Sequence, residues 1–152
     1  MDSQEITFIV GNEQLLDDIR ELWEELNQVH SEKSVDFKNH YLAFNFTARK
    51  ESIMRHIKNG KLLIVVAYHD NLKIGYCLSS VVDEVGEIAS LFVKSAYRKS
   101  AVGQKLMEQS LDWLRSNAAK QIIVKVSVGN EEAFGFYAKY GFAPCLTELH
   151  II

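Results

Sequence analysis

A basic loop between a predicted strand and a predicted helix is the part of the sequence best suited to chemistry. The loop runs from Lys94 to Gly103, and from Ile88 to Met107 the chain carries four basic residues and no acid. Unpaired N–H groups and the positive dipole end of the following helix favour an anion there. The small residues Ser100, Ala101 and Gly103 leave the backbone accessible to phosphate oxygens. The loop is therefore a candidate phosphate site, and an ordinary strand-to-helix connection fits its spacing equally well.

The elements around this loop predict a mixed sheet. Strands are predicted over residues 6–10, 61–68, 73–82 and 87–93, the last three as an antiparallel meander. A helix follows over 102–117, and an almost continuous apolar run over 122–128 predicts a strand covered on both faces. Strand, helix and strand in that order form a crossover unit. The predicted class is α+β, a largely antiparallel sheet flanked by helices with a parallel strand pair at its centre.

The remaining segments predict shorter elements. Asn12 is expected to cap a helix whose apolar face repeats as far as Val29. Two further helices are expected near residues 37–44 and 47–58. Asn130 is expected to cap a last helix, and the alternation from Leu146 to Ile152 predicts a final strand.

Composition limits the class of protein. The chain has 152 residues and a net charge of −3, which predicts a single domain over 1–152 and argues against broad nucleic-acid binding. Its longest apolar run is too short to cross a bilayer, and its start lacks the pattern of a secretory signal. The two cysteines make no disulfide framework, so we expect a cytoplasmic protein with both thiols in the core. The five histidines lack ligand spacing, and no metal site is predicted.

The modest net charge conceals a segregation. Residues 1–40 carry ten acids and three bases, whereas residues 88–130 carry seven bases and two acids. A local basic segment within an acidic protein indicates a small anionic ligand rather than a long polyanion. Solvated lysines are the alternative interpretation.

Two stretches carry a family resemblance. Arg98-Lys99-Ser100-Ala101-Val102-Gly103 follows the strand 87–93, and Asn130, Ala133, Phe136-Tyr137, Lys139 and Gly141-Phe142 come later. Together they resemble the acyl-coenzyme A motif and the following segment of the GNAT superfamily of N-acetyltransferases. The first motif normally reads Arg or Gln, two residues, Gly, one residue, then Gly or Ala. Ala101 departs from it, and its methyl group is expected to hinder positive φ and to crowd a phosphate.

The resemblance implies acetyl-coenzyme A as co-substrate. The pyrophosphate would lie on the N–H groups of the basic loop, and the pantetheine arm would pair with the backbone of the strand before it. Asn130 would support the arm from the next helix start. The implied cofactor-binding residues are Leu91, Phe92, Val93, Arg98, Lys99, Ser100, Ala101, Val102, Gly103, Gln104, Asn130 and Tyr137.

The implied reaction is direct transfer of an acetyl group to an amine, which must first lose a proton. A backbone N–H near Val93 would stabilise the oxyanion, and Tyr137 would protonate the leaving thiolate. Glu87 is the candidate base, acting through water. It lies six residues before Val93, so an ideal strand would place it on the same face and roughly 20 Å away. A bulge or bend would have to bring it closer. A buried aromatic role for Tyr137 and a solvated Glu87 are the alternatives.

The acceptor is less constrained by the sequence. The resemblance implies that the first helices line the acceptor side, and their acidity suggests a cationic amine as one hypothesis. A solvated acidic surface explains the same residues. The predicted function is acetylation of a small-molecule primary amine, with a protein or peptide amine, or a non-catalytic acyl-coenzyme A binding domain, as alternatives. No nucleic-acid or membrane partner is expected, and a homodimer is left open.

Overall fold

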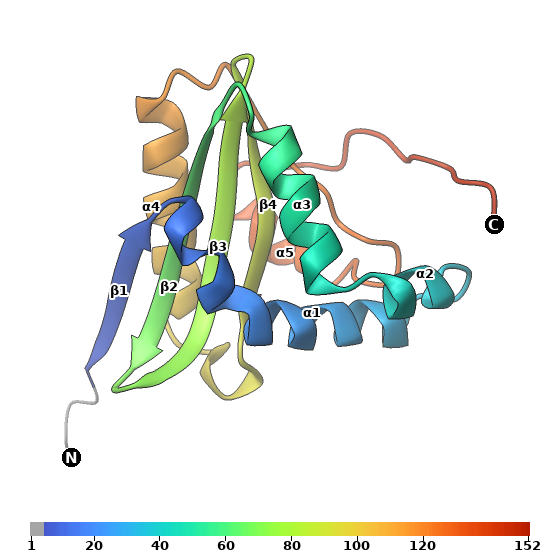
Figure 1. Cartoon of the computed structure of the whole chain (residues 1–152), viewed down its shortest axis with the longest axis horizontal. Coiled ribbons are helices and arrows are strands. Elements are labelled where there is room, and N and C mark those ends of the chain that lie inside the picture. Colours follow the sequence, from blue (N-terminus) through green and yellow to red (C-terminus); the bar gives the residue numbers. More distant parts are fainter. Residues whose placement is uncertain (1–4) are drawn as a thin grey trace.

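Five strands form one sheet in the order β1-β2-β3-β4-β5 in the computed structural model, which describes residues 5–152 (Figure 1). The first four strands pair antiparallel with their neighbours, and β4 and β5 pair in parallel. The predicted mixed sheet is therefore confirmed. The parallel pair lies at the edge of this sheet and not at its centre as predicted, because β5 is the last strand and no further strand pairs with it in residues 5–152. The strands are β1 (Ile6–Gly11), β2 (Lys61–His69), β3 (Leu72–Val82), β4 (Val85–Val93) and β5 (Gln121–Val124).

Helices cover both faces of the sheet, with α1 and α3 on one face and α4 on the other (Figure 1). The Asn12 side chain accepts a hydrogen bond from the Gln14 N–H at 3.4 Å, as its predicted capping role requires, although the first turns are 3-10. The α-helices are α1 (Arg20–Lys33), α2 (Lys38–Ala43), α3 (Phe46–His56), α4 (Val102–Ser116) and α5 (Ala133–Ala138), and the 3-10 helices are η1 (Glu13–Ile19) and η2 (Ser95–Tyr97).

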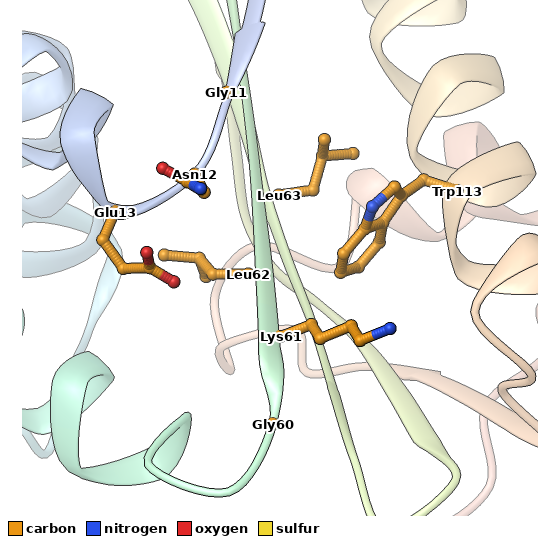
Figure 2. Close-up of a pocket in the computed structure, with 8 residues that line it drawn as sticks. All are labelled: Gly11, Asn12, Glu13, Gly60, Lys61, Leu62, Leu63 and Trp113. Carbon is orange, nitrogen blue, oxygen red and sulfur yellow. The ribbon is translucent and has the colours of Figure 1, made fainter.

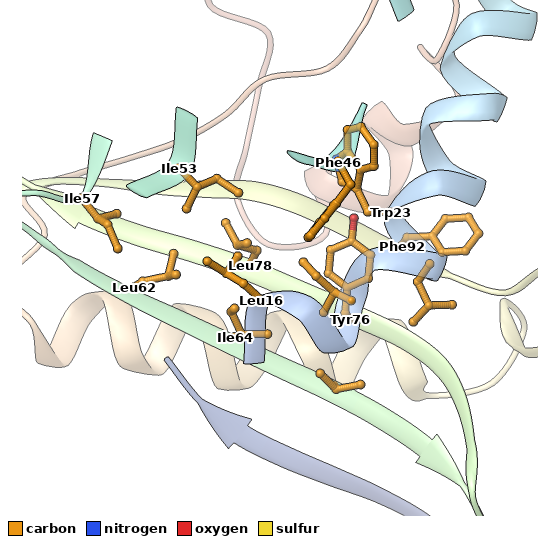
Figure 3. Close-up of a cluster of buried hydrophobic side chains, with 13 residues drawn as sticks. Leu16, Trp23, Phe46, Ile53, Ile57, Leu62, Ile64, Tyr76, Leu78 and Phe92 are labelled. Atoms are coloured by element: carbon orange, nitrogen blue, oxygen red, sulfur yellow. The ribbon is translucent and has the colours of Figure 1, made fainter. Parts of the chain in front are cut away.

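The alternation of the strands divides the core into two clusters. Tyr76 and Leu78 of β3 pack with α1 and α3 (Figure 3). Cys77 between them packs with α4 on the other side of the sheet. On the α3 side, Ile53 and Ile57 meet the side chains of β2 and β3 (Figure 3). Cys77 is buried as predicted, but the prediction for Cys145 is wrong because it lies exposed in the C-terminal segment.

A β-bulge at Ala89 interrupts β4. Leu78 of β3 pairs with Ser90, but Ser79 pairs with Ile88, so Ala89 is an extra residue. An extra residue shifts the in–out alternation of the strand by one position. Glu87 therefore lines the α3 side of the sheet, whereas Val93 packs on the α4 side. The prediction that these two share a face is wrong, since a period of two holds only along an uninterrupted ladder.

The bulge also marks the end of the parallel pairing. β4 and β5 pair only from Val85 with Gln121 to Ile88 with Val124. Over residues 5–152, no strand pairs with the stretch 89–93 on the β5 side. The predicted strand over 122–128 is thus too long, because the bulge bends β4 away from its neighbour and the ladder stops.

The C-terminal segment after α5 differs from its prediction. Residues 143–152 form no strand in the part of the chain that the structure describes, and the segment extends away from the sheet (Figure 1). Leu146, Leu149 and Ile151 are exposed there. Alternation provides a strand with an apolar face, but a strand also needs a partner for its backbone hydrogen bonds.

Candidate functional site

The basic loop ends at a helix start whose amides are available. The first intrahelical bond of α4 joins the Lys105 N–H to the Ala101 carbonyl at 3.0 Å, so the amides before Lys105 have no acceptor within the helix. Among the residues that the structure describes, the Val102 N–H approaches only the Ser100 hydroxyl, at 3.5 Å. Arg98 and Lys99 are exposed beside these amides. Fixed donors and two cations thus lie together, an arrangement suited to a phosphate group.

Ala101 does not distort this loop. Its φ of −79° and ψ of 10° lie at an ordinary helix entrance, so the expected need for positive φ is wrong. Gly103, two residues later, lets α5 pack closely against α4, since a Cβ on it would lie 3.4 Å from the Phe136 ring. Ala101 therefore adopts its conformation in the loop without backbone strain.

The end of β4 presents backbone groups on its unpaired side. The Lys94 N–H donates to the Ile74 carbonyl of β3 at 2.8 Å. Because an antiparallel ladder alternates, the backbone of Phe92 also faces β3, and Leu91 and Val93 face the β5 side. Of the three residues predicted to pair with the pantetheine arm, only Leu91 and Val93 have backbone groups free on that side. The Val93 carbonyl also accepts from Arg98 Nε at 2.9 Å, which ties the loop to the strand end.

Tyr137 lies on α5 against the α4 side of the sheet. Its ring contacts Phe136 and Phe142 with centroid separations of 5.3 and 5.9 Å. Burial raises the pKa of the Tyr137 phenol above its ordinary value of 10.0. The phenol therefore keeps its proton at neutral pH, as a general acid must.

Asn130 contacts the end of α1. Its side-chain oxygen accepts from Lys33 Nζ at 3.2 Å, and Lys33 also pairs with Glu132. The N-cap position of α5 belongs to Glu132, so the prediction that Asn130 caps this helix is wrong. Gly129 packs here as well, since a Cβ on it would lie 2.5 Å from the Lys33 carbonyl. The segment between β5 and α5 is thereby tied to α1.

A pocket of about 170 Å³, here called the α3 pocket, lies between α3 and the sheet. Its apolar wall belongs to the core cluster of Ile53, Ile57, Leu62 and Leu78 (Figure 3). Sequence reasoning found only one of its polar residues, Glu87, because the others come from separate elements without a common motif. The polar lining residues are Arg49, Ser52, His56, Ser80, Glu87 and Lys125.

The bulge places two groups of β4 in the α3 pocket. The Glu87 side chain is only 17% exposed, and Lys125 Nζ lies 4.0 Å from its carboxylate. The carbonyl of the bulged Ala89 accepts a hydrogen bond from Arg49 Nη2 at 3.4 Å. A bulge thus separates Glu87 from Val93, and Glu87 and Tyr137 lie on opposite sides of the sheet.

The family of this chain follows from its sequence match. The sequence model of the Acetyltransferase (GNAT) family matches residues 16–142. The chain belongs to the GNAT acetyltransferase family. The match spans the basic loop, β4 and Tyr137.

Relatives agree with this assignment. N-alpha-acetyltransferase 30 of Schizosaccharomyces pombe is 37% identical over 57 residues, which are 38% of this chain and 38% of that protein. The chain spans less than two thirds of the length of the curated relatives it matches.

Solved structures agree on the fold. PaiA N-acetyltransferase of Thermoplasma acidophilum, in complex with coenzyme A, has a TM-score of 0.71 and 18% identity, covering 95% of this chain and 93% of that one. A GCN5-related N-acetyltransferase of Ralstonia eutropha has a TM-score of 0.76 and 14% identity, covering 97% and 99%.

A larger hollow of this GNAT domain lies far from the motif. It has a volume of about 360 Å³ and lies where the end of β1 approaches the start of β2. Trp113 lies on one side of β2 and Glu13 on the other (Figure 2). None of the predicted site residues is among the described residues that line it. We assign no part of the reaction to this hollow.

Residues 5–152 contain no cluster of three or more His, Cys, Asp or Glu side chains that could hold a metal ion. They also contain no helix that is long and apolar enough to cross a membrane.

Proposed function

We propose that this protein transfers the acetyl group of acetyl-coenzyme A directly to the primary amine of a small molecule. One observation carries the proposal. The stretch of β4 without a partner on the β5 side has the basic loop and Tyr137 on the α4 side and the α3 pocket with Glu87 on the opposite side. A co-substrate along this strand edge would be reached by an acid from one face and a base from the other.

The residues of this chain fit coenzyme A. The exposed Arg98 and Lys99 and the first-turn amides of α4 would hold its pyrophosphate. The outward backbone groups of Leu91 and Val93 would pair with its pantetheine amides. When bound, the co-substrate supplies an activated acetyl thioester.

The protein's own groups would then move the protons. Glu87 would take a proton from the amine through a water molecule, and the amine nitrogen would bond to the acetyl carbon. The Val93 N–H would stabilise the negative charge developing on the acetyl oxygen. As the carbon–sulfur bond breaks, the Tyr137 phenol would protonate the sulfur, and the second proton lost by the nitrogen would restore the phenol. The products are an N-acetyl amide and free coenzyme A.

Acetylation of a peptide N-terminal amine is the second candidate. The 37% identity to the fission-yeast N-alpha-acetyltransferase over 57 residues favours it. The α3 pocket, at about 170 Å³, favours a small acceptor. The third alternative, a non-catalytic binding domain, does not explain why a proton donor and a carboxylate flank the same strand.

The acidic residues of the first helices give little support to a cationic acceptor. Several of them are paired with lysines at the surface instead of lining the α3 pocket. The pairs are Asp17 with Lys50 at 2.9 Å, Asp18 with Lys73 at 3.6 Å and Glu25 with Lys94 at 3.5 Å.

The direct test is an acetyl-coenzyme A consumption assay with small amines, polyamines and peptides bearing free N-termini. We expect turnover with at least one small primary amine and none with its N-acetyl form. Consumption only with peptides would support the second candidate. Binding of coenzyme A without acetylation of any amine would contradict both.

A further inference from the structure

The α3 pocket contains a guanidinium that forms no direct ion pair with a carboxylate of residues 5–152. Arg49 is half-buried on α3, and the only hydrogen bond of its guanidinium within residues 5–152 goes to the Ala89 carbonyl at 3.4 Å. Within the same residues, no carboxylate lies within 4.0 Å of its guanidinium. A guanidinium has five N–H donors in a fixed fork, and most of these remain available. A cation taken out of water normally has an anionic partner.

A second polar group of the same pocket also lacks a partner. Ser80 on β3 is 2% exposed, and its hydroxyl has no hydrogen-bond partner within the described chain. Its position next to the apolar wall makes the unsatisfied hydroxyl costly unless a ligand bonds to it. Arg49 and Ser80 come from different elements, so two independent features indicate a polar ligand.

The charges around the pocket indicate the sign of that ligand. Arg49 and Lys125 are positive, and Glu87 is the single acid among the lining residues. Glu87 lies 4.0 Å from Lys125 and acts on Arg49 without a direct ion pair, so these three groups leave the pocket with one excess positive charge. Because the amine to be acetylated must approach Glu87, Arg49 faces another part of the acceptor.

We infer that the acceptor carries a carboxylate, which Arg49 binds and to which the Ser80 hydroxyl donates. This inference rests on the proposed function and specifies its substrate class as small amino carboxylic acids. The carboxylate neutralises Arg49 while the amine of the same molecule faces Glu87. The volume of about 170 Å³ limits the acceptor to a short chain between its two groups.

The test compares L-alanine, β-alanine and 4-aminobutyrate, each with its own primary amide, as acceptors. Each acid and its amide differ in the charge of the carboxyl group but hardly in size. For the acceptor whose length fits best, we expect kcat/KM to be about 10- to 100-fold higher for the acid than for the amide. One charge-assisted hydrogen bond between Arg49 and the carboxylate contributes free energy on this scale. Arg49→Gln should remove this preference and keep activity on the amide.

Two further variants separate recognition from folding. Arg55→Gln replaces an exposed arginine of the same helix and should keep the preference of the wild type. Ser80→Ala removes a hydroxyl without a partner, so the unliganded protein should be no less stable, while kcat/KM for the acid falls about threefold to tenfold. If the wild type does not prefer acids, or if Arg49→Gln lowers acid and amide equally, the inference is wrong.

Binding measurements distinguish this inference from the proposed function. If the wild type acetylates no amine, the proposed function fails. The same acids and amides are then titrated calorimetrically into the protein saturated with coenzyme A. Binding of an acid that is tighter than that of its amide, and that Arg49→Gln abolishes, supports the carboxylate site. Equal binding of acid and amide, or binding of neither, overturns it.

Discussion

The two faces of the sheet beside β4 are built in different ways. On the α4 side, the candidate cofactor groups come mostly from one continuous stretch, Leu91–Gln104, and many of them are backbone groups. The α3 pocket instead combines side chains from α3, β3, β4 and the segment after β5. Recognition of a common cofactor through local backbone geometry leaves a motif in the sequence. Recognition of a particular acceptor through distant side chains leaves none.

The cations on the two faces differ in their environment as well. Arg98 and Lys99 are exposed, so salt screens their attraction for an anion. Arg49 is half-buried and has no carboxylate partner among the described residues, so its charge is screened less. The exposed pair suits a highly charged phosphate group, and the half-buried guanidinium suits a single well-placed carboxylate.

Loss of the acid on the α4 side should have the largest effect. Tyr137→Phe should lower kcat by about 100-fold, because a general acid contributes on this scale, while the affinity for coenzyme A changes less than about twofold. Steady-state kinetics with detection of the released thiol measure the first quantity, and calorimetry measures the second. Tyr140→Phe, on the next turn, is the matched control and should retain wild-type kcat.

The pH dependence provides a second measurement on the same variant. Burial raises the pKa of Tyr137 in the folded protein, so the unfolded chain ionises first as the pH rises. Its contribution to stability is present below pH 10.0 and is lost above that value. Between pH 9 and 11, the free energy of unfolding should therefore fall less in Tyr137→Phe than in the wild type, as denaturant unfolding at each pH would measure. Unchanged turnover in Tyr137→Phe would remove it from the mechanism.

Loss of the proposed base, Glu87, on the α3 side should have the second-largest effect. Glu87→Gln should lower kcat about 10- to 100-fold at neutral pH and remove the acidic limb of the pH–rate profile, because an amide cannot accept the proton. Glu84→Gln, in the turn before β4, removes an exposed carboxylate that pairs with Lys120 at 3.2 Å and should change neither quantity. Retention of the acidic limb in Glu87→Gln would contradict its role as base.

Removal of the exposed cations should have a smaller effect. Arg98→Gln combined with Lys99→Gln should weaken coenzyme A binding about tenfold at low salt, and the difference should shrink as salt rises. Titration calorimetry at several ionic strengths measures the affinity for coenzyme A and its dependence on salt. Arg115→Gln, near the other end of α4, is the control. Binding that is equally strong in the double variant would place the phosphates elsewhere.

Ala101→Gly should have the smallest effect. Since Ala101 already has a φ of −79°, glycine relieves no strain, and the affinity for coenzyme A should change less than about twofold. The same calorimetric titration measures it. A clear tightening would show that the methyl group crowds the phosphate.

Several features of the fold followed from local patterns. Runs of strand-favouring residues between turns located β2, β3 and β4, and the helical repeat located α4. The run of basic and small residues predicted a helix start with available amides. Other features needed contacts between distant segments. The bulge at Ala89 depends on how β4 pairs with β3, and the segment Leu146–Ile152 has a strand pattern without a paired strand in the described chain.

The sequence by itself therefore determined the class of fold, the family motif, and the positions of Tyr137 and the basic loop. These depend on periodicity and on neighbouring residues, which a linear sequence contains. Only the tertiary structure decided on which face Glu87 lies, where β4 loses its partner, and that Arg49 and Ser80 line one pocket. The reason is that one extra residue in a strand reverses every side chain beyond it, and that packing joins residues whose spacing carries no signal.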